Sequence, residues 1–235
     1  MHVALFNSLQ SARSAKTPVA LVTVLSDGGQ SLVYADRVEG NLPESVTAEA
    51  RQRLRDNAGG VIEQGDVRYF VDCHNPPLRI IVVGAVHISQ TLVPMAAIAG
   101  YEVIIIDPRA SFATAERFPN VRLVDDWPDE AMQALAPDGR TAIITLTHDP
   151  KLDDPALEVA LNSDAFYIAC LGSRRTHARR LERLRALGFD DATLGRIHGP
   201  AGLPIGAVSP AEIALSILAE LTAVLHEVET VAKAA

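Results

Sequence analysis

The segment 147–154 places a histidine among carboxylates, with His148 directly before Asp149. A histidine in such surroundings can act as an acid or base, as a metal ligand or as a donor to a bound ligand. The same residues can equally form a solvated loop with internal hydrogen bonds. We interpret Asp154 and Pro155 as the N-cap and first residue of a helix, which leaves the histidine and the other carboxylates without a capping role.

A second segment concentrates positive charge, because six arginines fall between Arg174 and Arg185. Ser173 is the expected N-cap of the helix that carries them. The helix dipole is positive at this end, so Arg174 and Arg175 are unfavourable there unless an anion binds among their guanidinium groups and the helix N–H groups. These two arginines therefore predict an anion site. The later arginines are expected on a solvated face or paired with Glu182.

A third segment begins at Gly84, where the dinucleotide-binding fingerprint G-x-G-x-x-G would be expected. Its second glycine is replaced by Val86, whose branched side chain would crowd a pyrophosphate, and its third by Ser89. Asp107 follows 23 residues after Gly84, about where an acid binds a ribose hydroxyl. Asp107 can also simply end a strand before a proline. Nucleotide binding and a purely structural turn both stay open.

Alternating strands and helices position these segments. Continuous apolar runs predict strands buried on both faces, as in a parallel sheet, and right-handed crossovers then give a doubly wound sheet of order 3-2-1-4-5. Ligands of such a sheet bind beyond the carboxyl ends of its strands, so the loops after the first, fourth and fifth strands should form one crevice. The expected strands are 79–83, 102–106, 121–124, 141–146 and 165–171, and the expected helices are 87–99, 129–135, 155–162 and 175–187.

Two successive prolines, Pro76 and Pro77, mark an expected linker. We expect a small N-terminal α+β domain at 1–75 and a larger α/β domain at 76–235. The smaller domain should contain strands at 19–25, 31–35 and 67–73 and a helix at 44–57.

A capping box from Ser209 to Glu212 predicts a long helix at the end of the sequence. We expect its apolar stripe to cover the sheet, with a homodimer seam as the alternative. The stripe consists of Ile213, Ile217, Leu221, Val224 and Val228.

The glycine- and proline-rich segment 197–206 is either a lid or a rigid connection. Four of the seven histidines fall in or beside the loops, but their spacings match no metal-ligand signature, so we expect no metal. These histidines are His87, His148, His177 and His198.

The composition of the 235 residues narrows the class of protein. Hydrophobic residues make up 48%, which favours a folded core over disorder. A net charge of −8 and only 5% aromatic residues argue against nucleic-acid binding. Two cysteines form no disulfide framework, and we find neither a signal peptide nor an apolar run of the roughly 20 residues that span a bilayer. We expect a cytoplasmic protein.

Several long segments resemble the xanthine dehydrogenase accessory proteins, the XdhC/CoxI family. The likeness covers about residues 76–228 and is weaker around 38–40 and 48–51. The resemblance implies a Rossmann-like domain in the C-terminal part. The segments are 106–109, 112–119, 147–157, 167–177 and 200–220.

The resemblance also implies a role in the maturation of molybdenum hydroxylases, such as xanthine or carbon monoxide dehydrogenase. Members of the family are described as binding molybdenum cofactor and passing its sulfurated form to the apoenzyme, as chaperones rather than turnover enzymes. This sequence departs from the family in two places. The family turn Gly-Ala-Gly-His reads Gly84 to His87 with valine third, and Ala35 to Arg37 stand where Gly-Gly-Cys is expected as a contact for the molybdenum or its sulfur.

Our leading interpretation is an accessory protein that binds molybdenum cofactor, or another phosphorylated and nucleotide-like small molecule, and docks onto a molybdenum hydroxylase apoenzyme. One alternative is an NAD(P)-dependent oxidoreductase, although no clear tyrosine–lysine pair for hydride chemistry is present. Another is a docking module without a ligand. The expected binding residues are Gly84, Ala85, Val86, His87, Asp107, Arg109, Thr147, His148, Asp149, Asp153, Gly172, Ser173, Arg174 and Arg175.

Overall fold

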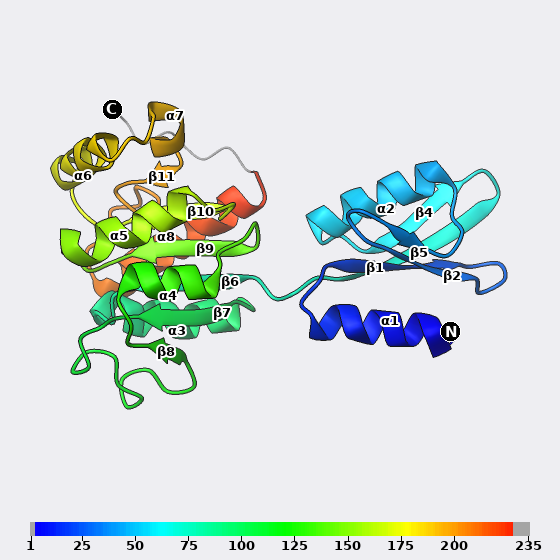
Figure 1. The fold of residues 1–235 in the computed structure, drawn as a ribbon, viewed down its shortest axis with the longest axis horizontal. Helices are drawn as coiled ribbons and strands as arrows, with labels where there is room; N and C mark the ends of the chain where they lie inside the picture. Colours follow the sequence, from blue (N-terminus) through cyan, green and yellow to red (C-terminus); the bar gives the residue numbers. More distant parts are fainter. Residues whose placement is uncertain (1–2, 228–235) are drawn as a thin grey trace. The chain divides into compact units, whose positions relative to one another are not determined.

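A computed structural model describes residues 3–227 of the chain (Figure 1). The chain divides between Pro76 and Pro77 into two compact units. Val228, the last residue of the expected apolar stripe, lies outside the described residues. The mixed α/β class predicted from the sequence is confirmed, since one unit contains an antiparallel sheet and the other a parallel sheet.

The N-terminal unit is a five-stranded antiparallel sheet with a helix on each face. Successive residues of a strand point to opposite faces, so Val19 and Leu21 pack against one helix while Ala20 and Val22 pack against the other. The sheet order is β3-β2-β1-β5-β4. Its elements are α1 (Val3–Ser14), β1 (Val19–Val24), β2 (Gln30–Val33), β3 (Val38–Glu39), α2 (Glu44–Asp56), β4 (Gly60–Gln64) and β5 (Val67–His74).

The C-terminal unit contains a six-stranded parallel sheet of order β11-β10-β9-β6-β7-β8. Five strands have the predicted order 3-2-1-4-5, and a short sixth strand lies beside the fifth, where a loop was expected. The strands are β6 (Arg79–Val83), β7 (Glu102–Ile106), β8 (Arg122–Val124), β9 (Thr141–Thr145), β10 (Tyr167–Cys170) and β11 (Ile197–His198).

Helices cover both faces of this sheet (Figure 1). On one face, α3 (His87–Ile98) and α8 (Pro210–Leu225) pack against alternate strand residues, and Ile217 and Leu221 of the expected stripe are fully buried there. The other face is covered by α4 (Pro128–Leu135), α5 (Pro150–Leu161) and α6 (Arg174–Ala186). A short helix, α7 (Asp191–Leu194), precedes β11.

Helix α5 begins five residues earlier than predicted. Asp149 is its N-cap and accepts a hydrogen bond from the N–H of Lys151, whereas Asp154 and Pro155 lie within the helix. Both Asp-Pro pairs carry the same start signature, and the first of them is used. The prediction that Asp149 has no capping role is therefore wrong.

Candidate functional site

The three loops that the sequence singled out meet at the carboxyl ends of β6, β9 and β10. Gly84 has a φ of +116°, and a Cβ atom there would lie 2.8 Å from Cγ2 of Thr147. Gly172 has a φ of +143°, and a Cβ atom there would lie 3.9 Å from Nδ1 of His148. We name each loop after the strand it follows, so the loops after β6, β9 and β10 are the first, fourth and fifth loops. The first loop thus contacts the fourth, and the fourth lies beside the fifth. We call their meeting point, at Gly84, Thr147, His148 and Gly172, the crevice.

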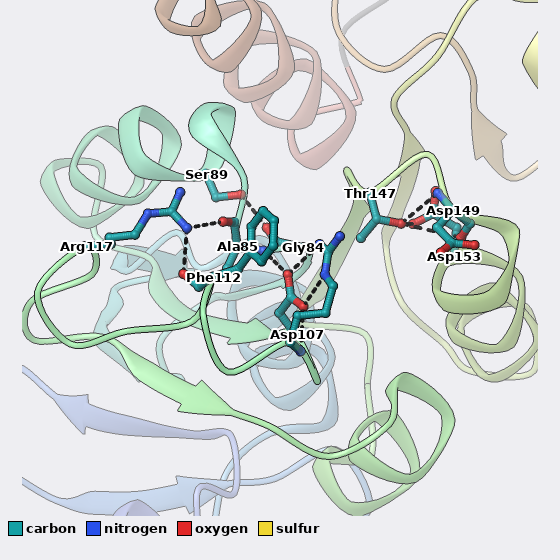
Figure 2. A network of polar contacts seen from close by, with 10 residues as sticks. Gly84, Ala85, Ser89, Asp107, Phe112, Arg117, Thr147, Asp149 and Asp153 are labelled. Carbon is teal, nitrogen blue, oxygen red and sulfur yellow. Dashed lines mark hydrogen bonds and ion pairs between the residues drawn. The ribbon is translucent and has the colours of Figure 1, made fainter.

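The turn at Gly84 and Ala85 is tied into the protein on every side (Figure 2). The N–H of Ala85 donates to Asp107 over 2.8 Å, and the carbonyl of Ala85 accepts from Arg117 over 2.9 Å. The N–H of Gly84 donates to β7, and its carbonyl accepts from Ser89. A pyrophosphate could bind these backbone groups only by displacing their partners within the protein. The turn therefore has a structural role.

Asp107 is fully buried and bound from two directions. In addition to the Ala85 N–H, it accepts hydrogen bonds from the N–H, Nε and Nη2 of Arg109 at 2.8–3.0 Å. Burial alone raises the pKa of this carboxyl, but the hydrogen bonds from Arg109 and Ala85 outweigh it, and the net pKa lies below its ordinary value. Both oxygens of the carboxylate are already used, so Asp107 is poorly placed to receive a ribose hydroxyl.

The fourth loop is organised by its own polar groups. The hydroxyl of Thr147 donates to Asp153 over 2.7 Å and accepts from the N–H of Asp149 over 3.0 Å (Figure 2). His148, between them, is exposed and has a φ of +62°, in the left-handed region that non-glycine residues seldom adopt. Such backbone strain is often found at binding sites, and it presents His148 beside Gly172.

A buried ion pair lies beneath the fourth and fifth loops. Arg180 and Asp153 are only 2% and 1% exposed, and Arg180 Nη2 lies 3.6 Å from Asp153 Oδ2. The same nitrogen donates to the carbonyl of Leu171 over 3.1 Å. Burial raises the pKa of Asp153 against the opposing effects of Thr147 and Arg180. The expectation that Arg180 lies on a solvated face is wrong.

The fifth loop starts α6 as expected. Ser173 is the N-cap, and its hydroxyl accepts from the N–H of Thr176 over 3.2 Å. Arg174 and Arg175 are exposed in the first turn, at the positive end of the helix dipole. At the start of α3, Val86 provides no side-chain cap and His87 is exposed. Positive charge and helix N–H groups therefore gather at the crevice.

The glycine- and proline-rich segment is held as a fixed connection. Ala201 donates its N–H to Cys170 of β10 over 2.9 Å, and Leu203 donates to Ser216 of α8 over 3.1 Å. Between them, the N–H of Gly202 donates to the buried carboxylate of Glu220 over 2.8 Å. Of the two alternatives drawn from the sequence, these bonds favour the rigid connection over the lid.

Residues 3–227 show neither a metal cluster nor a membrane span. No group of three or more histidine, cysteine, aspartate or glutamate side chains in this range is placed to hold a metal ion. No helix in the same range is long and apolar enough to cross a bilayer.

Comparison with known proteins gives consistent matches. A family model described as the XdhC Rossmann domain matches residues 80–221. The chain is 32% identical over 155 residues to the molybdenum cofactor insertion chaperone PaoD of Escherichia coli, covering 66% of this chain and 42% of PaoD. It is 29% identical over 153 residues to a probable xanthine dehydrogenase subunit of Bacillus subtilis, covering 65% of this chain and 44% of that protein.

An uncharacterized Escherichia coli protein, YqeB, is 30% identical over 161 residues, which cover 67% of this chain and 29% of YqeB. The chain thus spans less than half the length of each of these three relatives. A crystal structure described as a xanthine dehydrogenase from Bacillus halodurans superposes with a TM-score of 0.73 at 22% identity, covering 96% of this chain and 68% of that one. At this identity, the likeness shows a shared fold.

Proposed function

The chain belongs to the XdhC family, and on that premise we propose that it is an accessory protein for the maturation of a molybdenum hydroxylase of the xanthine dehydrogenase type. The names of two relatives, a molybdenum cofactor insertion chaperone and a xanthine dehydrogenase subunit, support this role. The proposal includes binding of molybdenum cofactor, or of another phosphorylated small molecule, at the crevice.

The observation that carries the ligand part is the cluster of positive charge at the crevice. Arg174 and Arg175 lie in the first turn of α6, beside the loop that holds His148. Guanidinium groups and helix N–H groups together bind phosphate well. In this proposal the two arginines neutralise the phosphate, Gly172 lets the ligand approach the backbone, and His148 orients polar groups. Asp153 is buried and holds the loop in place through Thr147.

The residues fit one end of molybdenum cofactor better than the other. When bound, the cofactor would bring a pterin ring, a phosphate and the molybdenum centre that the target enzyme uses. Arg174 and Arg175 are placed to bind the phosphate. The described residues of the crevice include no reactive thiol for the molybdenum centre. Cys170 is fully buried, and burial raises its pKa to about 11, so it stays protonated. This chain therefore holds the ligand by its phosphate.

The oxidoreductase alternative gains no support. Val86 occupies the position that must admit a pyrophosphate, and Asp107 is bound by Arg109 and Ala85. We therefore do not extend the proposal to NAD(P).

Native mass spectrometry of the full chain, purified from a host that makes molybdenum cofactor, tests the ligand. We expect a pterin-type mass on the wild type and its loss in the double variant Arg174→Ala/Arg175→Ala. The control Arg179→Ala/Arg185→Ala removes the same charge further along α6 and should keep the mass. Activation of a molybdenum hydroxylase apoenzyme is measured in parallel.

The outcomes separate the candidate functions. The proposal is wrong if the Arg174/Arg175 variant carries the same mass and activates the apoenzyme as well as the wild type. A nicotinamide mass would favour an enzyme or nucleotide sensor instead. A wild-type chain without ligand that still binds the apoenzyme would contradict the ligand part and favour a docking module.

A further inference from the structure

Helices cover the two faces of the N-terminal sheet unequally (Figure 1). The apolar cluster beneath α2 contains residues of β1, β2, β4 and β5, so α2 covers most of the width of its face. Among the described residues, the cluster beneath α1 contains residues of β1 and β2 but none of β4 or β5. The part of this face formed by β4 and β5 therefore lies outside the cover of α1.

We call this part of the face the bare half. Ile62, Tyr69 and Val71 face α2, so the residues that alternate with them point to the opposite face. The residues of the bare half are Val61, Glu63, Arg68, Phe70 and Asp72.

The bare half exposes apolar side chains. Val61 and Phe70 lie opposite each other in the antiparallel ladder, and they are 37% and 43% exposed. Arg68 lies beside them on the same face and is paired with Glu63 over 3.7 Å. A surface that covered the bare half would therefore bury two apolar side chains next to charges that already balance each other.

The outward face of α1 carries no charge. Leu9 and Ala12 of this helix are buried against the sheet, which fixes the outward positions at 3.6 residues per turn. The outward residues are Val3, Asn7, Gln10 and Ser14, and all four are exposed. Arg13 is the only charged residue among the 12 of α1. A surface helix usually carries charged residues on its outer face, so α1 is unusual for a helix in contact with water.

Helix α2 provides the comparison within the same unit. It covers the opposite face of the same sheet and carries charge along its whole length. Its charged residues are Glu44, Glu49, Arg51, Arg53, Arg55 and Asp56. The difference indicates that α2 faces water, whereas the outward face of α1 is suited to being covered.

Phe6 lies on the flank of α1 that faces the bare half. A groove of about 390 Å³ runs along the other flank, between Ser8 and Ser11 of α1 and Tyr34 at the end of β2. At 100° per residue, Phe6 lies opposite Ser8 and Ser11 around the helix. Phe6 is 47% exposed, so it extends the apolar surface of the bare half onto α1.

The face is complementary to itself, because it has a helix on one half and no helix on the other. A second copy turned about a two-fold axis parallel to α1 would place its α1 on the bare half of the first copy. The same rotation places the α1 of the first copy on the bare half of the second. Such an arrangement uses the same surface on both copies and closes with two chains.

We propose that α1 and the bare half together form an interface between two copies of this chain. Charge favours a second copy at this face, although each chain carries a net charge of −8. Arg13 and Arg68 balance Glu63 and Asp72, so the two surfaces that meet have no net charge to repel each other. The inference goes beyond the proposed function, whose ligand site lies in the C-terminal unit.

The test is sedimentation velocity of the full chain from about 1 to 100 µM. We expect the wild type to reach twice the mass of one chain. Phe70→Glu places a charge against the uncharged face of the partner helix and should raise the dimer dissociation constant at least about tenfold.

Leu215→Glu is the matched control for Phe70→Glu. Leu215 is 54% exposed on α8, the helix that the sequence offered as an alternative dimer seam. Its replacement by glutamate should leave the dissociation constant within about twofold.

Gln10→Glu provides a second test that does not depend on folding of the Phe70 variant. Gln10 is exposed, and the substitution keeps the size of the side chain while adding a charge to the outward face of α1. It should also raise the dissociation constant about tenfold, whereas Gln133→Glu, the same change at an exposed position of α4, should have little effect.

Three results would overturn the inference. A wild type that is monomeric throughout the concentration range would leave this face to a helix of another protein. Dimerisation of Gln10→Glu or of folded Phe70→Glu with the affinity of the wild type would place the interface elsewhere. Disruption by Leu215→Glu as strong as by Phe70→Glu would favour α8 as the interface.

Discussion

Arg180 and Asp153 form a buried ion pair between two helices, with Nη2 of the arginine 3.6 Å from Oδ2 of the aspartate. Each partner also binds a loop of the crevice. Asp153 accepts from Thr147 after β9, and Arg180 donates to the carbonyl of Leu171 after β10. The pair therefore holds the fourth and fifth loops at a fixed separation.

Replacing Arg180 by methionine should lower the free energy of unfolding by about 3–5 kcal/mol, because the carboxyl of Asp153 then stays buried without its counter-charge. Urea denaturation of the full chain measures the loss. The double variant Asp153→Leu/Arg180→Met should recover part of it, since no charge is left buried.

The control is the exposed pair of Arg185 and Asp191, whose atoms lie 2.6 Å apart. Arg185→Met should cost no more than about 1 kcal/mol, because water screens this pair. Equal losses for Arg180→Met and Arg185→Met would show that the buried pair has no special role in holding the loops.

The sheet of the C-terminal unit could be predicted because its strands are continuous apolar runs separated by helices. The burial of Arg180 could not. Arginines occur around much of α6, and which one turns inward depends on Asp153, a residue 27 positions away on another helix. β11 was missed for a different reason, since two residues are too few to form a pattern.

At the crevice, the sequence identified the loops and the cap at Ser173 but not how their polar groups pair. Gly84 and Asp107 have the spacing of a nucleotide site, yet Arg109 folds back onto Asp107 and the N–H of Ala85 completes its shell. The spacing is the same whether Asp107 binds a ribose hydroxyl or groups of the protein itself. Only the side-chain geometry distinguishes the two. In the N-terminal unit, α1 and β4 gave no strong periodic signal and were likewise missed.

Gly84→Ala should destabilise the protein more than glycine substitution elsewhere. The positive φ of +116° costs an alanine about 1–3 kcal/mol, and the new Cβ atom would lie 2.8 Å from Cγ2 of Thr147. Urea denaturation should show a further loss of about 1–3 kcal/mol from this contact.

Gly188→Ala is the matched control, since Gly188 has a φ of +101° with no atom within 4 Å of an added Cβ. Adding Thr147→Ser to Gly84→Ala removes the methyl group in the way and should recover stability, measured against Thr147→Ser alone. If Gly84→Ala costs no more than Gly188→Ala, the first and fourth loops do not pack as described.

Asp107→Asn should remove a pH-dependent part of the stability. The native pKa of Asp107 lies below its ordinary value of 3.8, so ionised Asp107 stabilises the folded state fully only above pH 3.8. This stabilisation is lost as the pH falls below 3.8 and through the native pKa. We expect a loss of about 1.5–3 kcal/mol at neutral pH in the variant, shrinking below about pH 4. The loss is measured from the urea midpoints of the wild type and Asp107→Asn across about pH 2–7, the range in which carboxylates titrate.

Arg109→Met provides the reference for this pH dependence. Without the guanidinium group, Asp107 loses its principal partner, so the effect of Asp107→Asn should vary less with pH in that background. Parallel stability curves for the wild type and Asp107→Asn throughout this range would contradict the proposed stabilisation of the ionised carboxyl.

Glu220→Gln should loosen the glycine- and proline-rich segment 197–206, which Glu220 holds through the N–H of Gly202. Oε2 of Glu220 accepts from both Tyr167 and Gly202, and Nδ1 of His198 lies 3.3 Å from Oε1. A neutral amide oxygen accepts hydrogen bonds more weakly than a carboxylate oxygen, so the bond from the N–H of Gly202 should weaken. Exchange of the Gly202 amide proton should accelerate by about tenfold or more, which hydrogen-exchange NMR measures.

Tyr167→Phe separates the contact at Gly202 from a general loss of packing. It removes one donor to Glu220 but leaves the carboxylate free to accept from Gly202, so exchange of that amide should change less than in Glu220→Gln. If the two variants accelerate exchange equally, Glu220 does not specifically hold Gly202.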